Sequence, residues 1–292
     1  MKNNDLSHSY NLIDDIPQIN PRNTLNDLSG KEWIILSKSL WFQKGLGQNH
    51  EETEIEQEHP APFSFQDIEK LIRLFTKPGM TILDPFCGIA STLKAAAFCN
   101  RNAIGIEISS KWVKLGKERL KKEIPQDIRK NVNLKVITGD CLKRLQKIDN
   151  ESIDFIVTSP PYWGILNKNP GHKIRNERVN KGLATRYSHS LNDLGNIKDY
   201  NEFLNKLNDM AKECYRLLKS KKYFALIVGD FYHKSKFYPF HIHAEKVFRE
   251  VGFNLRGINI LAQNNKKLYP YGYPYSFVQN IHHQYILIFQ KP

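Results

Sequence analysis

The fold is decided by residues 81–107, TILDPFCGIASTLKAAAFCNRNAIGIE. The apolar residues 81–83 predict a short strand, and NAIGIE, residues 102–107, predicts a second strand. Residues 90–99, between the two, predict a helix. Because a strand, a helix and a second strand in this order form a crossover unit, we expect the two strands to be parallel.

The same alternation continues on both sides of this unit. Further helices are predicted at residues 63–75, 109–124, 141–147, 199–219 and 240–251. Further strands are predicted at residues 133–138, 152–158, 223–228, 254–261 and 283–289. The predicted fold class is α/β, with a mostly parallel sheet of seven strands, helices on both faces and an antiparallel terminal hairpin at the sheet edge.

Two parts of unequal size are expected along the chain. Residues 1–58 form the first part, an N-terminal arm and helical segment, in which residues 30–42 have the apolar spacing of a helix. Residues 43–58 are polar and rich in glutamate, as in a solvated linker. Residues 59–292 form the second part, the main domain, which contains the residues expected to bind ligands and to react.

Residues 164–198 interrupt the regular pattern of the main domain. They hold seven lysines and arginines against two acidic residues. A segment of this length without periodicity is uncommon inside an α/β domain and is usually functional or mobile. Its charge predicts contacts with phosphate groups. The residues expected to make them are Lys173, Arg175, Arg178, Lys181 and Arg186.

The whole chain is basic, with 43 lysines and arginines against 30 acidic residues and a formal net charge of +13 at pH 7. This surplus favours a polyanionic partner, most simply nucleic acid, and a lysine-rich enzyme without such a partner is the alternative. The four cysteines lie far apart and form no metal-binding or disulfide pattern, which fits a reduced cytoplasm and predicts no metal. No apolar segment is long enough to span a membrane.

Small and polar residues follow each of the first four predicted strands of the main domain. They are DPFCGIA (84–90), Glu107, Gly139-Asp140 and SPPY (159–162). Each alone reads equally as an ordinary turn or helix cap. Since the carboxyl ends of parallel strands share one edge, together they predict a rim that binds a nucleoside, with Glu107 on the ribose. A dehydrogenase would carry GxGxxG, where this chain has FCGIAS.

The sequence resembles the amino-directed DNA methyltransferases that use S-adenosyl-L-methionine. LDPFCGIAST resembles their motif I, IGIE motif II, GDCL motif III, TSPPYW motif IV and HPAPFSFQDIEKLI motif X. The resemblance runs from about residue 24 to the C-terminus and implies the Rossmann-like fold of class I methyltransferases. One departure is Ala90, which stands where the family has its second motif I glycine and is expected to crowd the cofactor loop slightly.

The resemblance also implies the residues that bind the cofactor. The loop from Phe86 to Gly88 would lie along the methionine part, and Asp140 would hold the adenine amino group. Pro62 and Phe63 would close over the methionine end. The full set of expected cofactor residues is Pro62, Phe63, Asp84, Phe86, Cys87, Gly88, Glu107, Ile108, Asp140, Cys141 and Ser159.

The motif SPPY suits the chemistry of an exocyclic amino group, whose lone pair is delocalised into the base. The side-chain oxygen of Ser159 and the carbonyl of Pro160 can accept its two N–H bonds, and the two prolines, Pro160 and Pro161, stiffen the corner. Tyr162 would stack on a base that has left the duplex. Trp163 is expected equally in the pocket wall or in the core.

The sequence therefore predicts a DNA methyltransferase that acts on N4 of cytosine, because adenine enzymes more often carry DPPY. The alternatives are N6-adenine methylation of DNA, amino methylation of RNA, and a recognition subunit without turnover. The expected partner is double-stranded DNA in a bacterial-type cell, and a cognate restriction endonuclease is a candidate second partner. The aromatic string LYPYGYPYSF, residues 268–277, either stacks on bases or forms the hairpin that joins the last two strands.

Overall fold

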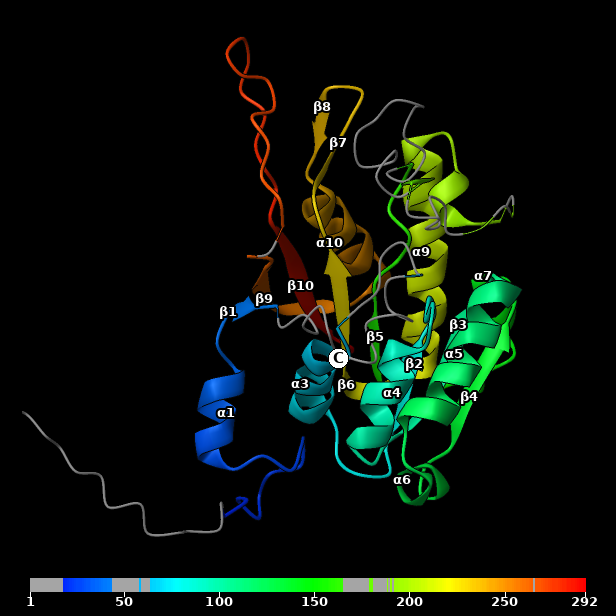
Figure 1. Cartoon of the computed structure of the whole chain (residues 1–292). Helices are drawn as coiled ribbons and strands as arrows, with labels where there is room; N and C mark the ends of the chain where they lie inside the picture. Colours follow the sequence, from blue (N-terminus) through cyan, green and yellow to red (C-terminus); the bar gives the residue numbers. More distant parts are fainter. Residues whose placement is uncertain are drawn as a thin grey trace, which may run out of the picture.

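The computed structural model describes residues 18–43, 58, 64–164, 179–180, 188, 190, 192–264 and 266–292. These residues form one large mixed sheet with helices on both faces, and a small hairpin beside it (Figure 1). The sheet strands are β1 (Leu40–Phe42), β2 (Thr81–Asp84), β3 (Asn102–Glu107), β4 (Leu134–Thr138), β5 (Ile153–Thr158), β6 (Leu218–Val228), β9 (Asn254–Ala262) and β10 (His283–Gln290). The hairpin consists of β7 (Phe231–His233) and β8 (Lys236–Tyr238). The helices are α1 (Gly30–Leu36), α3 (Phe65–Phe75), α4 (Ser91–Phe98), α5 (Ser110–Glu123), α6 (Gln126–Lys130), α7 (Cys141–Leu145), η1 (Leu194–Asn196), α9 (Tyr200–Leu217) and α10 (Phe240–Val251).

The strand order of the sheet is β1-β9-β10-β6-β5-β2-β3-β4. All neighbours run parallel except at β10, which is antiparallel to both β6 and β9. The predicted α/β class with an antiparallel terminal hairpin is confirmed. The order reverses between β2 and β5, because β3 and β4 follow β2 toward one edge while β5 lies on its other side. In open α/β sheets, ligands bind beyond the carboxyl ends of the strands at such a point.

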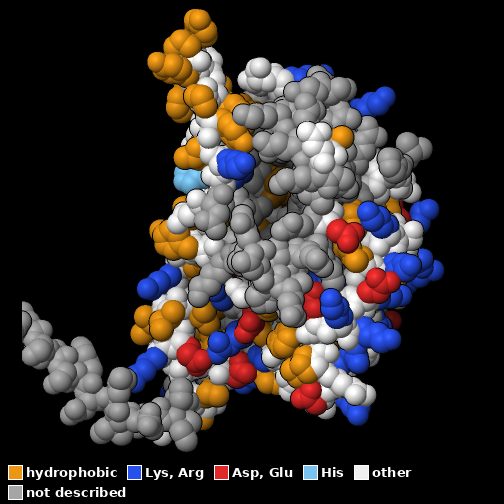
Figure 2. Space-filling view, viewed as in Figure 1, with side chains coloured by type: hydrophobic (Ala, Val, Ile, Leu, Met, Phe, Trp, Pro, Cys, Tyr) orange, Lys and Arg blue, Asp and Glu red, His pale blue; other side chains and the backbone are white. Residues whose placement is uncertain are grey.

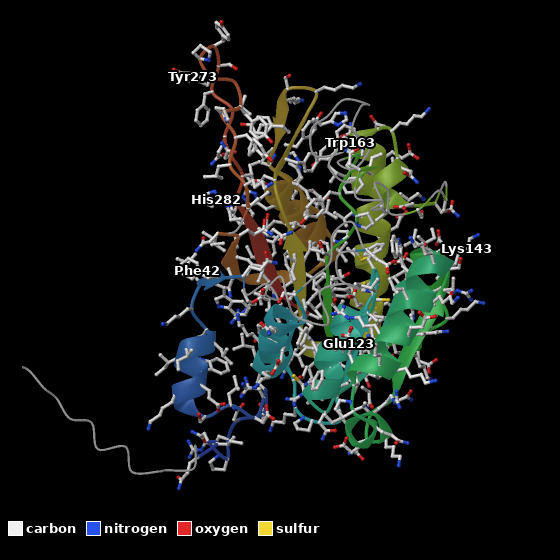
Figure 3. The ribbon with its side chains drawn as sticks, in the orientation of Figure 1. Phe42, Glu123, Lys143, Trp163, Tyr273 and His282 are labelled. Carbon is white, nitrogen blue, oxygen red and sulfur yellow. The ribbon has the colours of Figure 1, made fainter. Side chains whose placement is uncertain are left out.

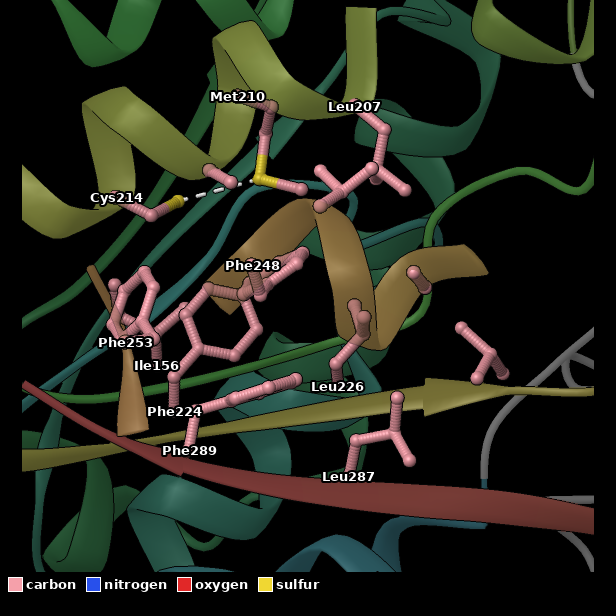
Figure 4. Packing of buried hydrophobic residues seen from close by; sticks show 14 of the residues in the cluster. Ile156, Leu207, Met210, Cys214, Phe224, Leu226, Phe248, Phe253, Leu287 and Phe289 are labelled. Atoms are coloured by element: carbon pink, nitrogen blue, oxygen red, sulfur yellow. Dashed lines mark hydrogen bonds between the residues drawn. The ribbon is translucent and has the colours of Figure 1, made fainter. Parts of the chain in front are cut away.

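The two faces of the sheet carry separate hydrophobic cores. On one face, α3 and α4 cover the sheet, and the alanines of α4 are buried because their small side chains let the helix lie close to the strands. On the other face, α9 and α10 pack over a core that is rich in aromatic rings (Figure 4). There the ring of Phe248 lies 4.9 Å from the rings of both Phe224 and Phe289. Both faces of the sheet are thus covered by helices, and the ends of the strands are left for a ligand to approach.

The sheet has one more strand than predicted, because β1 pairs with β9. The helix expected over residues 30–42 ends at Leu36, and the chain resumes as a strand at Leu40. Trp41 is buried between the exposed side chains of Leu40 and Phe42, which is the two-residue period of a strand. Three consecutive apolar residues hide that alternation in the sequence, and the prediction of a continuous helix was therefore wrong.

The described part of the N-terminal segment packs on the main domain. Asn26 donates from Nδ2 to the carbonyl of Leu74 at 2.6 Å, and Leu28 is buried. Asp27 forms a salt bridge of 3.0 Å with Arg101. Residues 18–43 therefore rest on α3 and on the turn before β3. Among the described residues, no helix has the length and apolar character needed to cross a bilayer.

Candidate active site

A cavity of about 660 Å³ lies at the carboxyl ends of β2, β3, β4 and β5. The four segments that the sequence predicted as one rim all line it, which confirms that they meet. The lining residues from these segments include Asp84, Phe86, Cys87, Gly88, Glu107, Ile108, Asp140, Cys141, Ser159, Pro160, Pro161 and Tyr162. Further lining residues come from segments that the sequence did not single out, among them Gln43, Asp193, Gln263 and Gln284.

Asp84 is buried at the end of β2 and holds three segments together. Its Oδ1 accepts from Thr158 Oγ1 at 2.6 Å and from the Phe86 amide at 3.0 Å. Its Oδ2 accepts from Thr92 Oγ1 at 2.5 Å. Burial raises the pKa of Asp84, while these hydrogen bonds act in the opposite direction. The carboxylate therefore ties the cofactor loop and α4 to the last residue of β5, directly before Ser159.

The loop after β2 is bent by residues in left-handed backbone conformations. Gly88 has φ +49°, and Ala90, which precedes α4, has φ +64°. The left-handed conformation costs an alanine roughly 1–2 kcal/mol that glycine does not incur. Ala90 is also fully buried, so its methyl group lies against neighbouring atoms. Burial raises the pKa of the Cys87 thiol well above its ordinary value, which favours the protonated thiol over the reactive thiolate.

Glu107 ends β3 with its carboxylate on the cavity. Its Oε1 accepts from the Ser109 amide at 2.8 Å, and its Oε2 accepts from the Gly88 amide at 3.2 Å. Burial raises the pKa of Glu107 to about 7, which these backbone hydrogen bonds only partly oppose. The group therefore changes charge near neutral pH.

Asp140 also lines the cavity and lies directly before α7. Its Oδ1 accepts from the Lys143 amide at 3.1 Å and so caps this helix. Within the part of the chain that the structure describes, its Oδ2 has no hydrogen-bond partner. A cavity-lining carboxylate oxygen without a partner suits a ligand that donates an N–H or O–H bond.

The SPPY corner follows β5 and brings Tyr162 to the cavity. The hydroxyl of Tyr162 accepts from Gln284 Nε2 at 2.8 Å. The Ser159 side chain and the Gly229 backbone lie close enough to this hydroxyl to act on its pKa. Burial raises the pKa of Tyr162 to about 12, so the hydroxyl stays protonated at neutral pH. Its ring meets Phe240 edge-on at 5.8 Å. Tyr162 is thus held at its hydroxyl by Gln284 and at its ring by Phe240.

Trp163, which the sequence left between pocket and core, belongs to the core. It is buried, and its ring lies 5.0 Å from Tyr200, 4.4 Å from His233 and 5.2 Å from Tyr238. These aromatic rings come from α9 and the β7–β8 hairpin. The two residues of the motif therefore point apart, with Tyr162 on the cavity and Trp163 in the packing beneath it.

Three glutamines extend the contacts of Tyr162 along the cavity wall. Gln263 donates from Nε2 to Gln43 Oε1 at 3.1 Å and lies 3.5 Å from Gln284 Oε1. Gln43 follows β1, Gln263 follows β9 and Gln284 lies in β10, so the pairing of these strands brings the three together. Because each is an isolated polar residue in the sequence, only the strand register could have revealed the group.

Several predicted residues lie outside the described part of the chain. They are Pro62, Phe63, Lys173, Arg175, Arg178, Lys181 and Arg186. Their roles in binding the cofactor and DNA stay predictions. The described residues contain no group of three histidine, cysteine, aspartate or glutamate side chains that could hold a metal ion.

The chain is similar to one protein family and to several known proteins. The family model described as DNA methylase, N6_N4_Mtase, matches residues 13–118 and 153–292. The type II methyltransferase M.BglI of Bacillus subtilis is 30% identical over 122 residues, which are 39% of this chain and 33% of the relative. M.SmaI of Serratia marcescens is 33% identical over 98 residues, 34% of this chain and 27% of the relative. The match spans a third or less of each curated relative. A SAM-dependent methyltransferase structure from Aquifex aeolicus is 13% identical, with 84% of this chain and 100% of that chain covered and a TM-score of 0.45.

Proposed function

Because the chain belongs to the DNA methylase family N6_N4_Mtase, we propose that it methylates the exocyclic N4 amino group of cytosine in double-stranded DNA. One observation carries the proposal. A single cavity is lined by Glu107 and Asp140 and also by the SPPY corner. Groups suited to a nucleoside and groups suited to an amino nitrogen therefore face the same space.

S-adenosyl-L-methionine is the cofactor of this family, as the motifs predicted. The residues present fit it: Glu107 offers a carboxylate for ribose hydroxyls, and Asp140 Oδ2 is available for the adenine amino group. Phe86 and Ile108 supply apolar wall between them. When bound there, the cofactor supplies a methyl group on a positively charged sulfur.

The residues of the corner act on the amino group rather than on the methyl donor. Its nitrogen is a poor nucleophile because the lone pair is shared with the ring. Ser159 Oγ and the Pro160 carbonyl would accept the two N–H bonds and so turn the lone pair out of the plane of the base. Because the prolines fix the backbone, these acceptors are in place before the reaction. Tyr162 offers a ring for the extruded base, and no covalent nucleophile is needed.

Cytosine is favoured over adenine by the serine at position 159. The family comprises both activities, and adenine enzymes more often carry aspartate at this position. N6-adenine methylation of DNA, amino methylation of RNA and a recognition subunit without turnover are the alternatives that the experiment must separate.

The function is tested by incubating the full chain with labelled S-adenosylmethionine and, separately, duplex DNA and RNA of mixed sequence. The nucleic acid is then digested to nucleosides and separated by chromatography. Label in N4-methyldeoxycytidine is the expected result. Label in N6-methyldeoxyadenosine would overturn the choice of cytosine, and label only in RNA would overturn the choice of DNA. Cofactor binding without transfer to any substrate would indicate a recognition subunit.

Glu107→Gln should remove a pH dependence from cofactor binding. Since ribose hydroxyls bond better to an ionised carboxylate, wild-type affinity should rise as the pH passes upward through about 7 and level off above it. Below that pH the affinity should fall by up to about tenfold per unit. The variant should bind weakly and without this slope. Calorimetric titration with S-adenosylhomocysteine measures both, and Glu118→Gln, on the exposed side of α5, is the control. A flat wild-type profile would contradict the assignment.

The same raised pKa has an opposite effect on the fold. An unfolded glutamate ionises at lower pH than Glu107 in the folded chain. The folded state therefore becomes less stable, relative to the unfolded state, as the pH rises from the ordinary glutamate pKa to about 7. Without cofactor, Glu107→Gln should raise the melting temperature above pH 7 and have little effect at pH 4.

Gln284→Leu should lower turnover while leaving cofactor affinity unchanged. Leucine is shorter and apolar and cannot donate to the Tyr162 hydroxyl, so the ring is held less firmly. Loss of one neutral hydrogen bond predicts a decrease of roughly three- to tenfold. Gln290→Leu is a matched control, since Gln290 donates to the Lys221 carbonyl at the opposite end of the same strand. Equal turnover in the two variants would mean that Gln284 does not position Tyr162.

A further inference from the structure

The chain between β9 and β10 forms a projecting segment, of which residues 263, 264 and 266–282 are described and which we call the aromatic arm. It rises from the large sheet on the same side as the β7–β8 hairpin (Figure 1). Tyr273 lies at its outer end and His282 near its root (Figure 3). At the tip, Tyr273 is 80% exposed, Tyr275 94% and Phe277 87%. Figure 2 shows hydrophobic side chains at the end of this segment, which projects beyond the rest of that face.

The arm is held by hydrogen bonds between its two limbs. Asn280 donates from Nδ2 to the Tyr269 carbonyl at 2.7 Å and accepts on Oδ1 from the Tyr269 amide at 3.0 Å. At the tip, the Gly272 carbonyl accepts from the amides of Tyr275 and Ser276, both at 2.7 Å. Since the backbone is braced, the tip rings can bind without the entropic cost of ordering a free loop.

The root of the arm belongs to the wall of the active-site cavity. Gln263 begins the arm, Gln284 lies just beyond its end, and both line the cavity. Gln284 donates to the Tyr162 hydroxyl. The backbone amide of Gln263 donates to the backbone carbonyl of His282 at 2.8 Å and so joins the two ends of the arm. A molecule that placed a base against Tyr162 would therefore pass beside the arm.

The charges around the arm favour a polyanion. Between residues 263 and 283 there are two lysines and two histidines and no acidic residue. The neighbouring β7–β8 hairpin contributes Lys234 and Lys236, and its Tyr232 hydroxyl accepts from the Gln279 amide at 3.3 Å. Exposed aromatic rings flanked by cations fit nucleic acid, whose bases offer stacking faces beside phosphates. A second protein chain would need an acidic apolar surface instead.

We propose that the aromatic arm is a DNA-contacting wedge whose tip rings, Tyr273, Tyr275 and Phe277, stack on bases next to the target. This inference rests on the proposed function, because it supposes a duplex from which a base is extruded. Apolar side chains inserted at a base step compensate for stacking lost when the helix is opened. The arm thus acts on the DNA rather than on the reacting atoms.

The test replaces the three tip rings together, as Tyr273→Ser, Tyr275→Ser and Phe277→Ser. A fluorescent duplex of a sequence that the wild-type chain methylates is titrated at several salt concentrations. Affinity should fall roughly tenfold or more, while the slope of log K against log salt stays the same because no charge is removed. Lys266→Ala with Lys267→Ala should instead lower that slope by about 0.9 per lysine. Ile34→Ser with Ile35→Ser, at exposed apolar positions on α1, is the control and should change neither.

A second experiment tests whether the tip acts as a wedge. The tip variant should regain most of its methylation rate on a duplex with an abasic site opposite the target base, because that base is already unpaired. Unchanged affinity and rate on the intact duplex would overturn the proposal. The proposal would also be overturned if light scattering showed that the tip variant loses self-association while its DNA affinity stays intact. The tip would then bind a second copy of the chain. If the wild-type chain methylates no DNA, the proposed function fails as well, and that outcome is separate from a failure of the wedge alone.

Discussion

Ser159→Ala should lower turnover by about two to three orders of magnitude, the range seen when one preorganised polar group is removed from a transition-state site. The serine oxygen accepts an N–H bond that strengthens as the amino nitrogen attacks, so its loss is felt in the transition state more than in the ground state. Affinity for S-adenosylhomocysteine and for DNA should change little. Tyr162 keeps its hydrogen bond from Gln284, so the corner itself should persist.

Single-turnover methylation with pre-bound DNA separates this chemical step from binding and product release. Ser159→Asp is the informative companion, because it restores an acceptor at the same position and should recover part of the rate. A structural role alone predicts no such recovery. If Ser159→Ala kept near-normal turnover, the SPPY corner would not be the site that orients the amino group, and most of the proposed function would lose its basis.

The sequence predicted best those features that depend on local pattern and chain order. The strand at residues 102–107 and the helix at residues 240–251 have the bounds expected from their apolar spacing. The rim followed from a single rule, that the carboxyl ends of parallel strands meet at one edge. For this reason Glu107, Asp140 and Ser159 could be grouped although they are far apart in the chain.

Features that depend on pairing between distant segments could not be predicted. The helix expected to reach residue 219 ends at Leu217, and β6 begins at Leu218. This boundary could not be predicted, because no glycine or proline marks the change from helix to strand. The glutamines around Tyr162 meet only through the register of β1, β9 and β10. The predicted cofactor residue Asp84 proved to be bonded to Thr92 and Thr158, which no local pattern indicates.

Gly105→Ala should destabilise the fold and weaken cofactor binding together. Gly105 is the glycine of IGIE in β3, and a Cβ built there would lie 2.6 Å from Cys87 Sγ and 2.6 Å from Leu93 Cδ1. Both atoms belong to buried residues, one in the cofactor loop and one in α4. Overpacking of this kind costs about 1–3 kcal/mol, which should appear as a lower urea midpoint with an unchanged slope. Displacement of Cys87 should also disturb the bond from the Gly88 amide to Glu107, so affinity for S-adenosylhomocysteine should fall.

Gly257→Ala provides the matched control, since Gly257 also lies within a strand, β9, but has no heavy atom within 4 Å of the added methyl group. It should be neutral or slightly stabilising, because alanine has fewer unfolded conformations. Cys87→Ala combined with Gly105→Ala should recover part of the loss, because the sulfur that clashes is gone. Additive effects of these two changes would exclude the contact with Cys87 Sγ as the cause, because the contact with Leu93 Cδ1 remains in both variants. Recovery of both stability and cofactor affinity would show that the motif II glycine is required because the cofactor loop lies directly on β3.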